Sequence, residues 1–267
     1  MAVRVSLVIN TLNEEEHIGD CILSAQGLAD EVLVVDMSSN DKTADIARSL
    51  GASVHTVPRF PFVDPTRNYA LSLACGEWIL LIDADQRVTP TLADELRVIA
   101  ADDLADVVEV ADEVHMFGDI IRYSGWQYPR KKIFFKKGFL TYSAVEVHSH
   151  PTWKGRLLSL APSKGMLVHY NYRDIRHFIL KMNDYTDGEA LKLLRAGGNH
   201  SPLRGAYWGL RHFFRRYFLC FGYRDGLMGF VLSVLMGFYW FLSFAKAWEI
   251  KRKGSYSHKM KAVQEDK

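Results

Sequence analysis

Short apolar runs alternate with longer amphipathic stretches through the first hundred residues of the chain. Short runs predict strands at Val3–Ile9, Glu31–Asp36, Ser53–Val57 and Glu77–Ile82, and the first, which is rich in β-branched residues, fits a strand buried on both faces. The stretches between them predict helices at Asn13–Leu28, Ser39–Leu50 and Thr66–Ala74. Asn13 is the expected N-cap of the first helix. Strands and helices that alternate through short loops predict parallel βαβ units, and so an α/β fold.

The later sequence is less regular, although four more elements can be predicted. A helix is expected over Pro90–Ala101, strands over Asp106–Glu113 and Ile133–Lys136, and a long helix over Ile175–Arg195. From Pro202 onward the composition changes sharply toward aromatic and basic residues.

The residues that follow each predicted strand are polar, and ligands of open α/β sheets bind outside the carboxyl ends of the strands. These residues are Asn10–Glu14, Asp36–Ser39, Pro58–Arg59 and Asp83–Asp85. We expect them to lie close together in space although they are scattered along the chain.

Asp83 and Asp85 form the strongest candidate for a metal site. Two carboxylates at i and i+2 on a loop leaving a strand can face one cation, and carboxylate oxygens suit Mg²⁺ or Mn²⁺. A pair of this kind can also be one helix cap and one solvated acid. However, Asp36 and Glu14 place further acids at neighbouring strand ends, and like charges so close require compensation. Together they favour a site for a nucleotide and a metal.

Size and charge narrow the class of protein. The chain has 267 residues and a formal net charge of +2, which gives no strong bulk attraction to nucleic acid. Its three cysteines have no metal-ligand spacing, which favours buried thiols in a reducing compartment. The first residues show no stretch of signal-peptide length, so we expect the N-terminal domain to face the cytoplasm.

The segment Gly226–Ala245 is about twenty residues long and uncharged, which is the length that crosses a bilayer core. Basic residues flank it on both sides and give no clear orientation. The preceding WGLRHFFRRYFL interleaves arginine with aromatic residues, as helices lying in the membrane interface do. We therefore expect membrane association. The alternatives are a buried hairpin and a surface for single-stranded nucleic acid, which the uncharged stretch disfavours.

Three segments in order carry a family resemblance: LVINTLNEEEHIGDCILSA, EVLVVDMSSNDKTADIA and RNYALSLACGEWILLIDADQRVTP. Together they resemble the inverting family 2 glycosyltransferases of the GT-A fold. Later stretches, among them SGWQYP, VHYNYRDIRHFILKMNDYT and FAKAWE, are similar to the lipopolysaccharide-core β-1,4-glucosyltransferase subgroup. The resemblance implies a mostly parallel sheet flanked by helices, followed by an aromatic and basic helical segment that associates with the membrane.

The resemblance also implies roles for single residues. Thr11, Asn13 and Glu14 match the loop around the base and ribose of the nucleotide, and Asp36 matches an acid that contacts them. Arg67 and Asn68 match a pair that closes the nucleotide pocket, Asp83 matches an acid near the ribose, and Asp85 matches the metal ligand. Each of these residues stands where the motif of the family requires it.

The catalytic base and the remaining metal ligand are less sharply defined. The subgroup usually reads Val-His-Glu where this chain reads Val147-His148-Ser149, so Glu146 is the preferred base for the acceptor hydroxyl. Asp119, His148 and His150 are the other candidates. His169, in LVHYNYRD, is a candidate third metal ligand beside Asp83 and Asp85, although a single histidine among aromatic residues is more often structural.

These observations predict a metal-dependent inverting hexosyltransferase on the cytoplasmic face of the inner membrane. Residues 1–200 would form the GT-A domain, with the nucleotide-sugar half over about 1–100 and the acceptor half over about 101–200, and residues 201–267 the membrane-associated segment. The expected cofactor is Mg²⁺ or Mn²⁺. The expected donor is a nucleotide-sugar such as UDP-glucose and the acceptor a membrane glycolipid, with no nucleic-acid partner. The alternatives are a polyprenyl-phosphate glycosyltransferase and a catalytically inactive nucleotide-sugar-binding module.

Overall fold

The structure, a computed structural model, describes residues 4–60, 64–142, 151–197 and 200–253. The chain forms two compact units. The first comprises Met1–His115 and Tyr128–Asn171, and the second comprises Met116–Gln127 and Tyr172–Lys267. The division into a GT-A domain over residues 1–200 and a membrane-associated segment over residues 201–267 stays a prediction.

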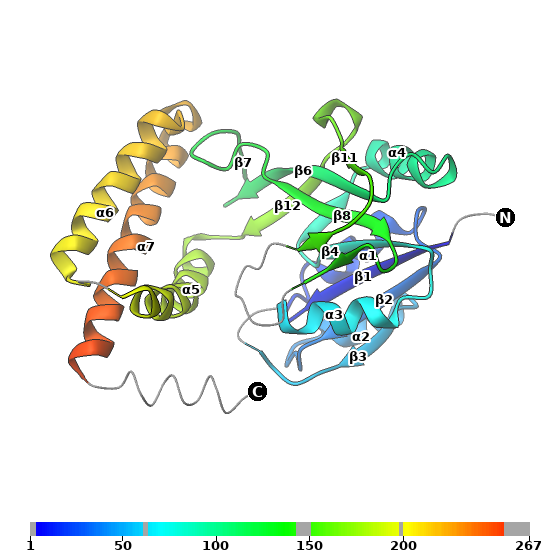
Figure 1. Ribbon diagram of the computed structural model, residues 1–267, viewed down its shortest axis with the longest axis horizontal. Coiled ribbons are helices and arrows are strands. Elements are labelled where there is room, and N and C mark those ends of the chain that lie inside the picture. The colour runs from blue at the N-terminus through cyan, green and yellow to red at the C-terminus, as the bar shows by residue number, and fades with distance from the viewer. Residues whose placement is uncertain (1–3, 61–63, 143–150, 198–199, 254–267) are drawn as a thin grey trace. The chain divides into compact units, whose positions relative to one another are not determined.

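The first unit is built on one mixed sheet with the strand order β3-β2-β1-β4-β8-β6-β12-β5 (Figure 1). The strands are β1 (Val5–Thr11), β2 (Glu31–Asp36), β3 (Ser53–Thr56), β4 (Trp78–Asp83), β5 (Gln86–Val88), β6 (Val107–Met116), β8 (Arg130–Lys136) and β12 (Leu167–Tyr172). The first four pair in parallel, and β8 runs antiparallel to β4 and β6. Helices flank this sheet, so the unit has the GT-A-like architecture that the sequence predicted.

Shorter elements complete this unit. β11 (Leu157–Ser159) pairs with β6, while β9 (Leu140–Thr141) and β10 (Thr152–Trp153) form a separate two-stranded sheet. A 3₁₀ turn, η1, spans Pro162–Lys164.

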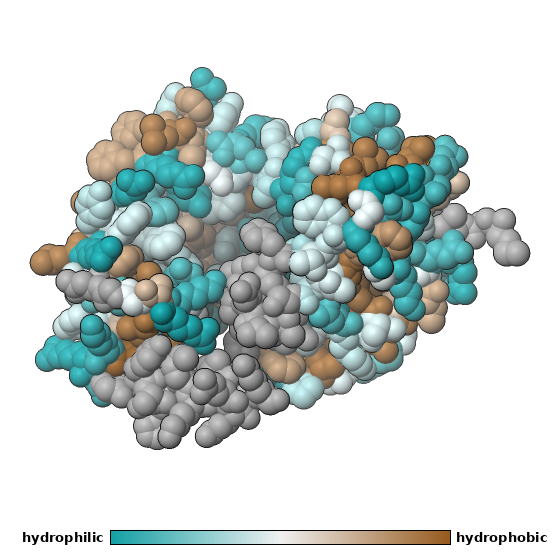
Figure 2. Space-filling view, viewed as in Figure 1, coloured by the Kyte–Doolittle hydropathy of each residue, from teal (hydrophilic) through white to brown (hydrophobic). Residues whose placement is uncertain are grey.

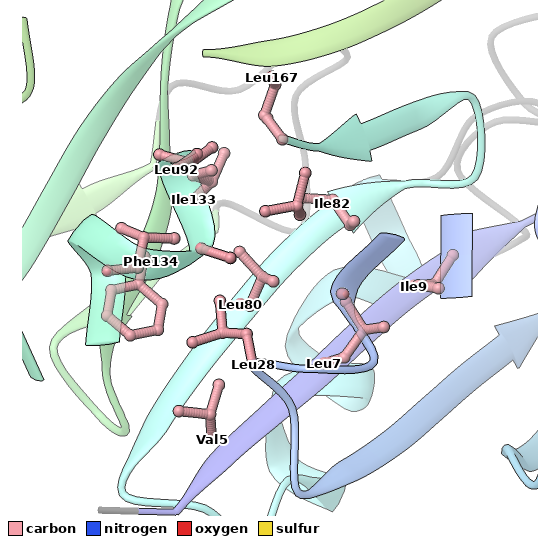
Figure 3. Close-up of a cluster of buried hydrophobic side chains, with 14 of the residues drawn as sticks. Val5, Leu7, Ile9, Leu28, Leu80, Ile82, Leu92, Ile133, Phe134 and Leu167 are labelled. Carbon is pink, nitrogen blue, oxygen red and sulfur yellow. The ribbon is translucent and has the colours of Figure 1, made fainter. Parts of the chain in front are cut away.

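Alternate residues of the central strands face opposite layers of core. Leu7, Ile9, Leu80 and Ile82 pack with α1 (Ile18–Ala25), α2 (Thr43–Ser49) and α4 (Pro90–Ala101) (Figure 3). Val8, Ile79 and Leu81 pack with α3 (Asp64–Leu73) on the other face. Both faces are therefore buried, which is why these strands read as continuous apolar runs.

The first two helices begin later than the sequence predicted. α1 starts at Ile18 with His17 as its N-cap, so Asn13 is not the cap. Asn13 has a left-handed backbone with φ 56°, and its side-chain oxygen accepts a hydrogen bond from the backbone N–H of Asn40 at 2.9 Å. Asparagine tolerates this conformation because it can bond locally. The polar residues 13–17 and 39–42 therefore form loops at the sheet edge, and the helices follow them.

A cluster of ion pairs fastens the loop before β11 to the start of β6. Asp106 accepts hydrogen bonds from the backbone N–H of Arg156 at 2.8 Å and from Lys136 Nζ at 2.7 Å. Hydrogen bonds from Arg156, together with the charge of Lys136, hold the pKa of Asp106 well below its usual range. Asp103 contacts the same two cations.

We expect Asp106→Asn to lower the thermal midpoint by several degrees at pH 7. Because the folded-state pKa is depressed, the stabilisation is present above the unfolded pKa of about 4 and is lost as the pH falls further. The difference between variant and wild type should therefore shrink at pH 3, as followed by circular dichroism. Asp45→Asn, which removes an exposed acid paired with Arg48, is the control. Equal midpoints at pH 7 would contradict the prediction.

The second unit is mainly helical. It contains α5 (Ile175–Ala196), α6 (Pro202–Phe214) and α7 (Gly226–Arg252), with the π-helical turn η2 (Arg215–Leu219) and the 3₁₀ turn η3 (Gly222–Asp225), and a short strand, β7 (Asp119–Ile121). The bounds of α5 confirm the helix predicted over Ile175–Arg195. α6 and α7 lie side by side and antiparallel (Figure 1). A Cβ on Gly209 would come within 2.7 Å of the carbonyl oxygen of Gly237, so glycine permits this close backbone approach.

Large apolar side chains remain exposed along these helices. On α6 and η2 they recur at helical spacing, and Figure 2 shows brown atoms at the surface in the region where α6 lies. The exposed set is Leu203, Tyr207, Leu210, Phe214 and Phe218. On α7, Leu227 is 78% exposed, and the helical segment Gly222–Arg252 is long and apolar enough to cross a membrane by length and composition alone.

Candidate functional site

The strand register aligns the polar residues at the carboxyl edge of the sheet. Thr11 on β1 lies opposite Asp36 on β2, and Asn10 on β1 lies opposite Asp83 on β4. The expected clustering of strand ends is therefore present for three neighbouring strands. It follows from parallel pairing, because all three strands end at the same edge.

The loops after β1 and β2 are joined by hydrogen bonds. The backbone N–H of Asn13 donates to Ser39 Oγ at 2.8 Å, and that of Glu14 donates to Thr43 Oγ1 at 2.8 Å. Asp36 is almost fully buried and accepts a hydrogen bond from the backbone N–H of Ser39 at 3.1 Å. The two loops thus form one hydrogen-bonded rim around the end of β1.

Two atoms at this edge are buried without a hydrogen-bond partner among the described residues, namely Asn10 Oδ1 and Thr11 Oγ1. Buried polar atoms are normally satisfied, so atoms of this kind require a ligand or ordered water. Thr11 Oγ1 can both donate and accept, which suits a polar ligand at the end of β1.

Asp83 lies between two cations. Arg67 Nη2 is 3.0 Å from its Oδ1, and Lys131 Nζ is 3.4 Å from its Oδ2. Burial alone would raise the pKa of Asp83, but these two cations hold it well below its usual range. Burial would likewise lower the pKa of Lys131, and the carboxylates of Asp83 and Asp112 raise it. Asp83 is therefore a charged carboxylate that is already compensated.

Asp85 faces His169 on β12. The backbone N–H of Tyr170 donates to the carbonyl oxygen of Asp85 at 2.9 Å, which holds β12 beside the loop after β4. His169 Nε2 is 3.5 Å from Asp85 Oδ1, and His169 Nδ1 is 3.1 Å from Oδ2 of Asp112 on β6. Burial would lower the pKa of His169, but these two carboxylates raise it to about 9. The two carboxylates therefore stabilise a positive charge at this position, which either a proton on His169 Nε2 or a cation in its place can supply.

Three residues of this network were absent from the expected set: Gln86, Asp112 and Lys131. Gln86 Oε1 accepts a hydrogen bond from the backbone N–H of Asp83 at 2.9 Å, and its Nε2 is 3.4 Å from Asp112 Oδ2. Lys131 Nζ is also 3.5 Å from Asp112. The available signal was an acid at an apolar strand position, since Asp112 takes the alternate position between Val110 and Val114 in the run VVEVADEV.

Arg67 and Asn68 of α3 both contact Tyr142, the last described residue before the segment that carries the expected base. The side chain of Asn68 exchanges hydrogen bonds with the backbone of Tyr142, and the Arg67 guanidinium lies 5.1 Å from the centre of the Tyr142 ring. Glu146, His148 and His150 lie outside the described residues. Asp119 belongs to β7 in the second unit.

The donor atoms present fit a divalent cation held by few protein ligands. Within the described part of the chain, no group of three or more His, Cys, Asp and Glu side chains could hold a metal. Asp85, in the turn between β4 and β5, supplies one oxygen, and His169 on β12 supplies one nitrogen. Mg²⁺ commonly completes its shell with water and substrate phosphates. His169 Nδ1, the ring nitrogen remote from Asp85, is hydrogen-bonded to the carboxylate of Asp112, as is usual for a metal-ligating histidine. Asp83 is less suited, because both its oxygens already face cations.

Comparison with known proteins places the chain in a family. Residues 6–156 match the family described as Glycosyl transferase family 2. An uncharacterized glycosyltransferase of Rickettsia typhi is 31% identical over 94% of this chain and 88% of its own length. The lipopolysaccharide core biosynthesis glycosyltransferase LpsC of Rhizobium meliloti is 28% identical over 92% of both chains.

Solved structures show a more limited likeness. Glucosyl-3-phosphoglycerate synthase from Mycobacterium tuberculosis, solved in complex with Mn²⁺, uridine diphosphate and glucosyl-3-phosphoglycerate, is 25% identical. The match covers 42% of this chain and 44% of that chain, with a TM-score of 0.36.

The family match spans more than half of the chain and includes the ends of β1, β2 and β4 described above. This chain is therefore a glycosyltransferase and belongs to glycosyl transferase family 2.

Proposed function

We propose that the protein is a divalent-metal-dependent inverting glycosyltransferase that transfers a hexose from a UDP-sugar to a membrane glycolipid, such as a lipopolysaccharide core. The observation that carries the proposal is the pair Asp85–His169. This pair lies beside the sheet edge that also holds Thr11, Asp36 and Asp83.

The residues at the carboxyl edge of the sheet would bind the nucleotide-sugar donor. Thr11, Asn13, Glu14 and Asp36 would bind the base and ribose from the rim of the two joined loops. Asp83, kept ionised by its cation neighbours, would accept hydrogen bonds from ribose hydroxyls. Arg67 and Asn68 would close the pocket on one side, as the family resemblance implies.

Asp85 and His169 would hold the metal. When bound, a divalent cation stabilises the negative charge that develops on the leaving diphosphate, so no proton donor is needed there. On the acceptor side, an inverting transfer requires a base for the attacking hydroxyl. Glu146 remains the proposed base.

The proposed acceptor rests on two independent observations. The relative LpsC is named for lipopolysaccharide core biosynthesis and aligns with this chain over nearly its whole length. The second unit exposes apolar residues on α6, with the exposed Arg211 and Arg215 beside them. Such a surface favours the cytoplasmic face of an inner membrane, where a glycolipid acceptor is concentrated. Arg216 differs from these arginines, because it donates a hydrogen bond to the carbonyl oxygen of Ser124 and packs over Trp126.

Thermal unfolding with UDP, GDP, ADP and CMP, each with and without Mn²⁺, tests the donor site. Because a ligand that binds only the folded state stabilises it by mass action, we expect UDP with Mn²⁺ to add about 2.7 kcal/mol at a hundred times its dissociation constant. We expect smaller shifts with the other nucleotides and with UDP alone. If no nucleotide shifts the unfolding of the folded protein, the proposed metal-bridged donor site is wrong.

A further inference from the structure

Asp112 occupies a position that sheet packing does not explain. It lies in the middle of β6 with no exposed surface, at the alternate position between the buried Val110 and Val114. A buried carboxylate is costly unless it is paired and hydrogen-bonded, by several kcal/mol per ion. An apolar residue would pack there without that cost, so the carboxylate points to contacts that use its charge.

The contacts of Asp112 are concentrated on one oxygen. Oδ2 lies 3.1 Å from His169 Nδ1, 3.4 Å from Gln86 Nε2 and 3.5 Å from Lys131 Nζ. Its Oδ1 is buried and makes no hydrogen bond within the described residues. The carboxylate is therefore held by donors on three different strands, and all three belong to the surroundings of Asp83 and Asp85.

These contacts restrain both halves of the proposed metal site. His169 and Gln86 are paired residues across β12 and β5, and Gln86 also accepts the hydrogen bond from the backbone N–H of Asp83. Asp112 thus connects the loop that carries Asp85 with the strand that carries His169. A shift of either element would break a hydrogen bond to the same buried oxygen.

We propose that Asp112 is a positioning residue for the metal site, which accepts the Nδ1–H of His169 so that the Nε2 lone pair faces Asp85 and the cation. The inference rests on the proposed function, because it assigns the metal to Asp85 and His169. An imidazole has two nitrogens that can bind a metal, and the hydrogen bond made by one determines which of them is available. Asp112 makes no contact with the metal itself in this arrangement.

The test is Asp112→Asn, examined as the full chain with Mn²⁺ and UDP. An amide keeps the shape of the side chain and one acceptor oxygen but removes the negative charge, so the hydrogen bond from His169 Nδ1–H to residue 112 becomes weaker and holds the ring less firmly. We expect Mn²⁺ affinity, measured by electron paramagnetic resonance of free Mn²⁺, to fall about 10- to 100-fold. The electron spin-echo modulation from a Mn²⁺-bound imidazole nitrogen should be present in the wild type and weakened in the variant.

Glu113→Gln is the matched control, since Glu113 is the next residue of β6 and contacts the imidazole of His115 at 2.9 Å. It should leave both signals unchanged. A double-mutant cycle separates positioning from general damage, because Asp112→Asn should change Mn²⁺ affinity little once His169→Ala has removed the ring. Additive losses, or an Asp112→Asn variant with wild-type affinity and nitrogen modulation, would overturn the proposal.

A measurement on the wild type covers the case in which Asp112→Asn does not fold. With ¹¹³Cd²⁺ in place of Mn²⁺ and ¹⁵N-labelled histidine, the metal should couple to Nε2 of His169. Coupling of ¹¹³Cd²⁺ to Nδ1 of His169 instead would contradict the proposal. A wild type that binds neither Mn²⁺ nor Cd²⁺ in the presence of UDP would instead refute the proposed metal-dependent function.

Discussion

Asp85→Asn should abolish the Mn²⁺-dependent stabilisation by UDP and lower sugar transfer by about a thousandfold. Loss of a single group that stabilises transition-state charge costs 10²–10³ in rate, and loss of the cation removes such a group from the leaving diphosphate. The amide keeps the volume of the side chain and can still face His169. The variant should therefore fold, and thermal unfolding without ligands is the measurement that checks this.

The same variant should keep part of its affinity for UDP in the absence of metal. Thr11, Asp36 and Asp83 lie on β1, β2 and the end of β4, and none of them depends on Asp85 for its position. Asp94→Asn, which removes an exposed acid paired with Arg97 on α4, is the control and should transfer sugar at the wild-type rate. A variant at Asp85 that retains a Mn²⁺-dependent UDP shift would show that the metal lies elsewhere.

The double variant Leu210→Asp/Phe214→Asp should bind vesicles about a hundredfold more weakly than the wild type. Leu210 is 62% exposed and Phe214 is 54% exposed, one turn apart on α6. Moving the exposed part of each side chain from water into a bilayer contributes about 1–2 kcal/mol. Losing both contributions, about 3 kcal/mol together, corresponds to about two factors of ten in partition. Flotation with vesicles of phosphatidylcholine and phosphatidylglycerol measures the change.

A matched pair of exposed apolar residues exists in the first unit. Val98 is 49% exposed and Leu104 is 53% exposed, so Val98→Asp/Leu104→Asp removes a similar apolar area outside the helical unit. We expect this control to bind vesicles like the wild type. Equal binding by the two double variants would refute α6 as the membrane-facing surface, as would a wild type that does not float with vesicles.

Salt dependence should separate the two contributions to vesicle binding. The attraction of Arg211 and Arg215 to anionic lipid is screened by salt, whereas the apolar contribution of α6 is not. The segment Gly222–Arg252, which contains α7, has enough length and apolar character to insert into the membrane. If it inserts, it adds to the apolar contribution, which salt does not screen.

The parallel core and its ligand-binding edge could be predicted from sequence because both depend on local patterns. The buried strand Trp78–Asp83 reads as an uninterrupted apolar run ending in a polar residue, and Val5–Thr11 is mostly apolar before it ends in Asn10 and Thr11. Parallel pairing then places those ends at one edge, whatever the detailed register. The glycosyltransferase family follows from the same segments, because the nucleotide loop, the second strand and the Asp83–Asp85 loop occur in order.

Helix starts were harder to predict, for a reason visible at Asn13. Its polar side chain and the acids after it have the composition of a helix cap and first turn. In the fold they instead bond to the loop after β2, which lies beside them only because β1 and β2 are paired. A contact with a neighbouring strand end thus overrode the local preference for a cap.

The register of β8, β6, β12 and β5 determined which side chains surround Asp83 and Asp85. By itself the sequence determined that acids end the parallel strands β2 and β4 and that a histidine precedes the long helix α5. Only the tertiary structure decided that His169 lies beside Asp85, that Asp112 holds the far nitrogen of its ring, and that Lys131 compensates Asp83. These pairs are 48 or more residues apart and come from antiparallel or mixed pairing. A shift of one residue in register would turn each side chain to the opposite face, so no local pattern encodes them.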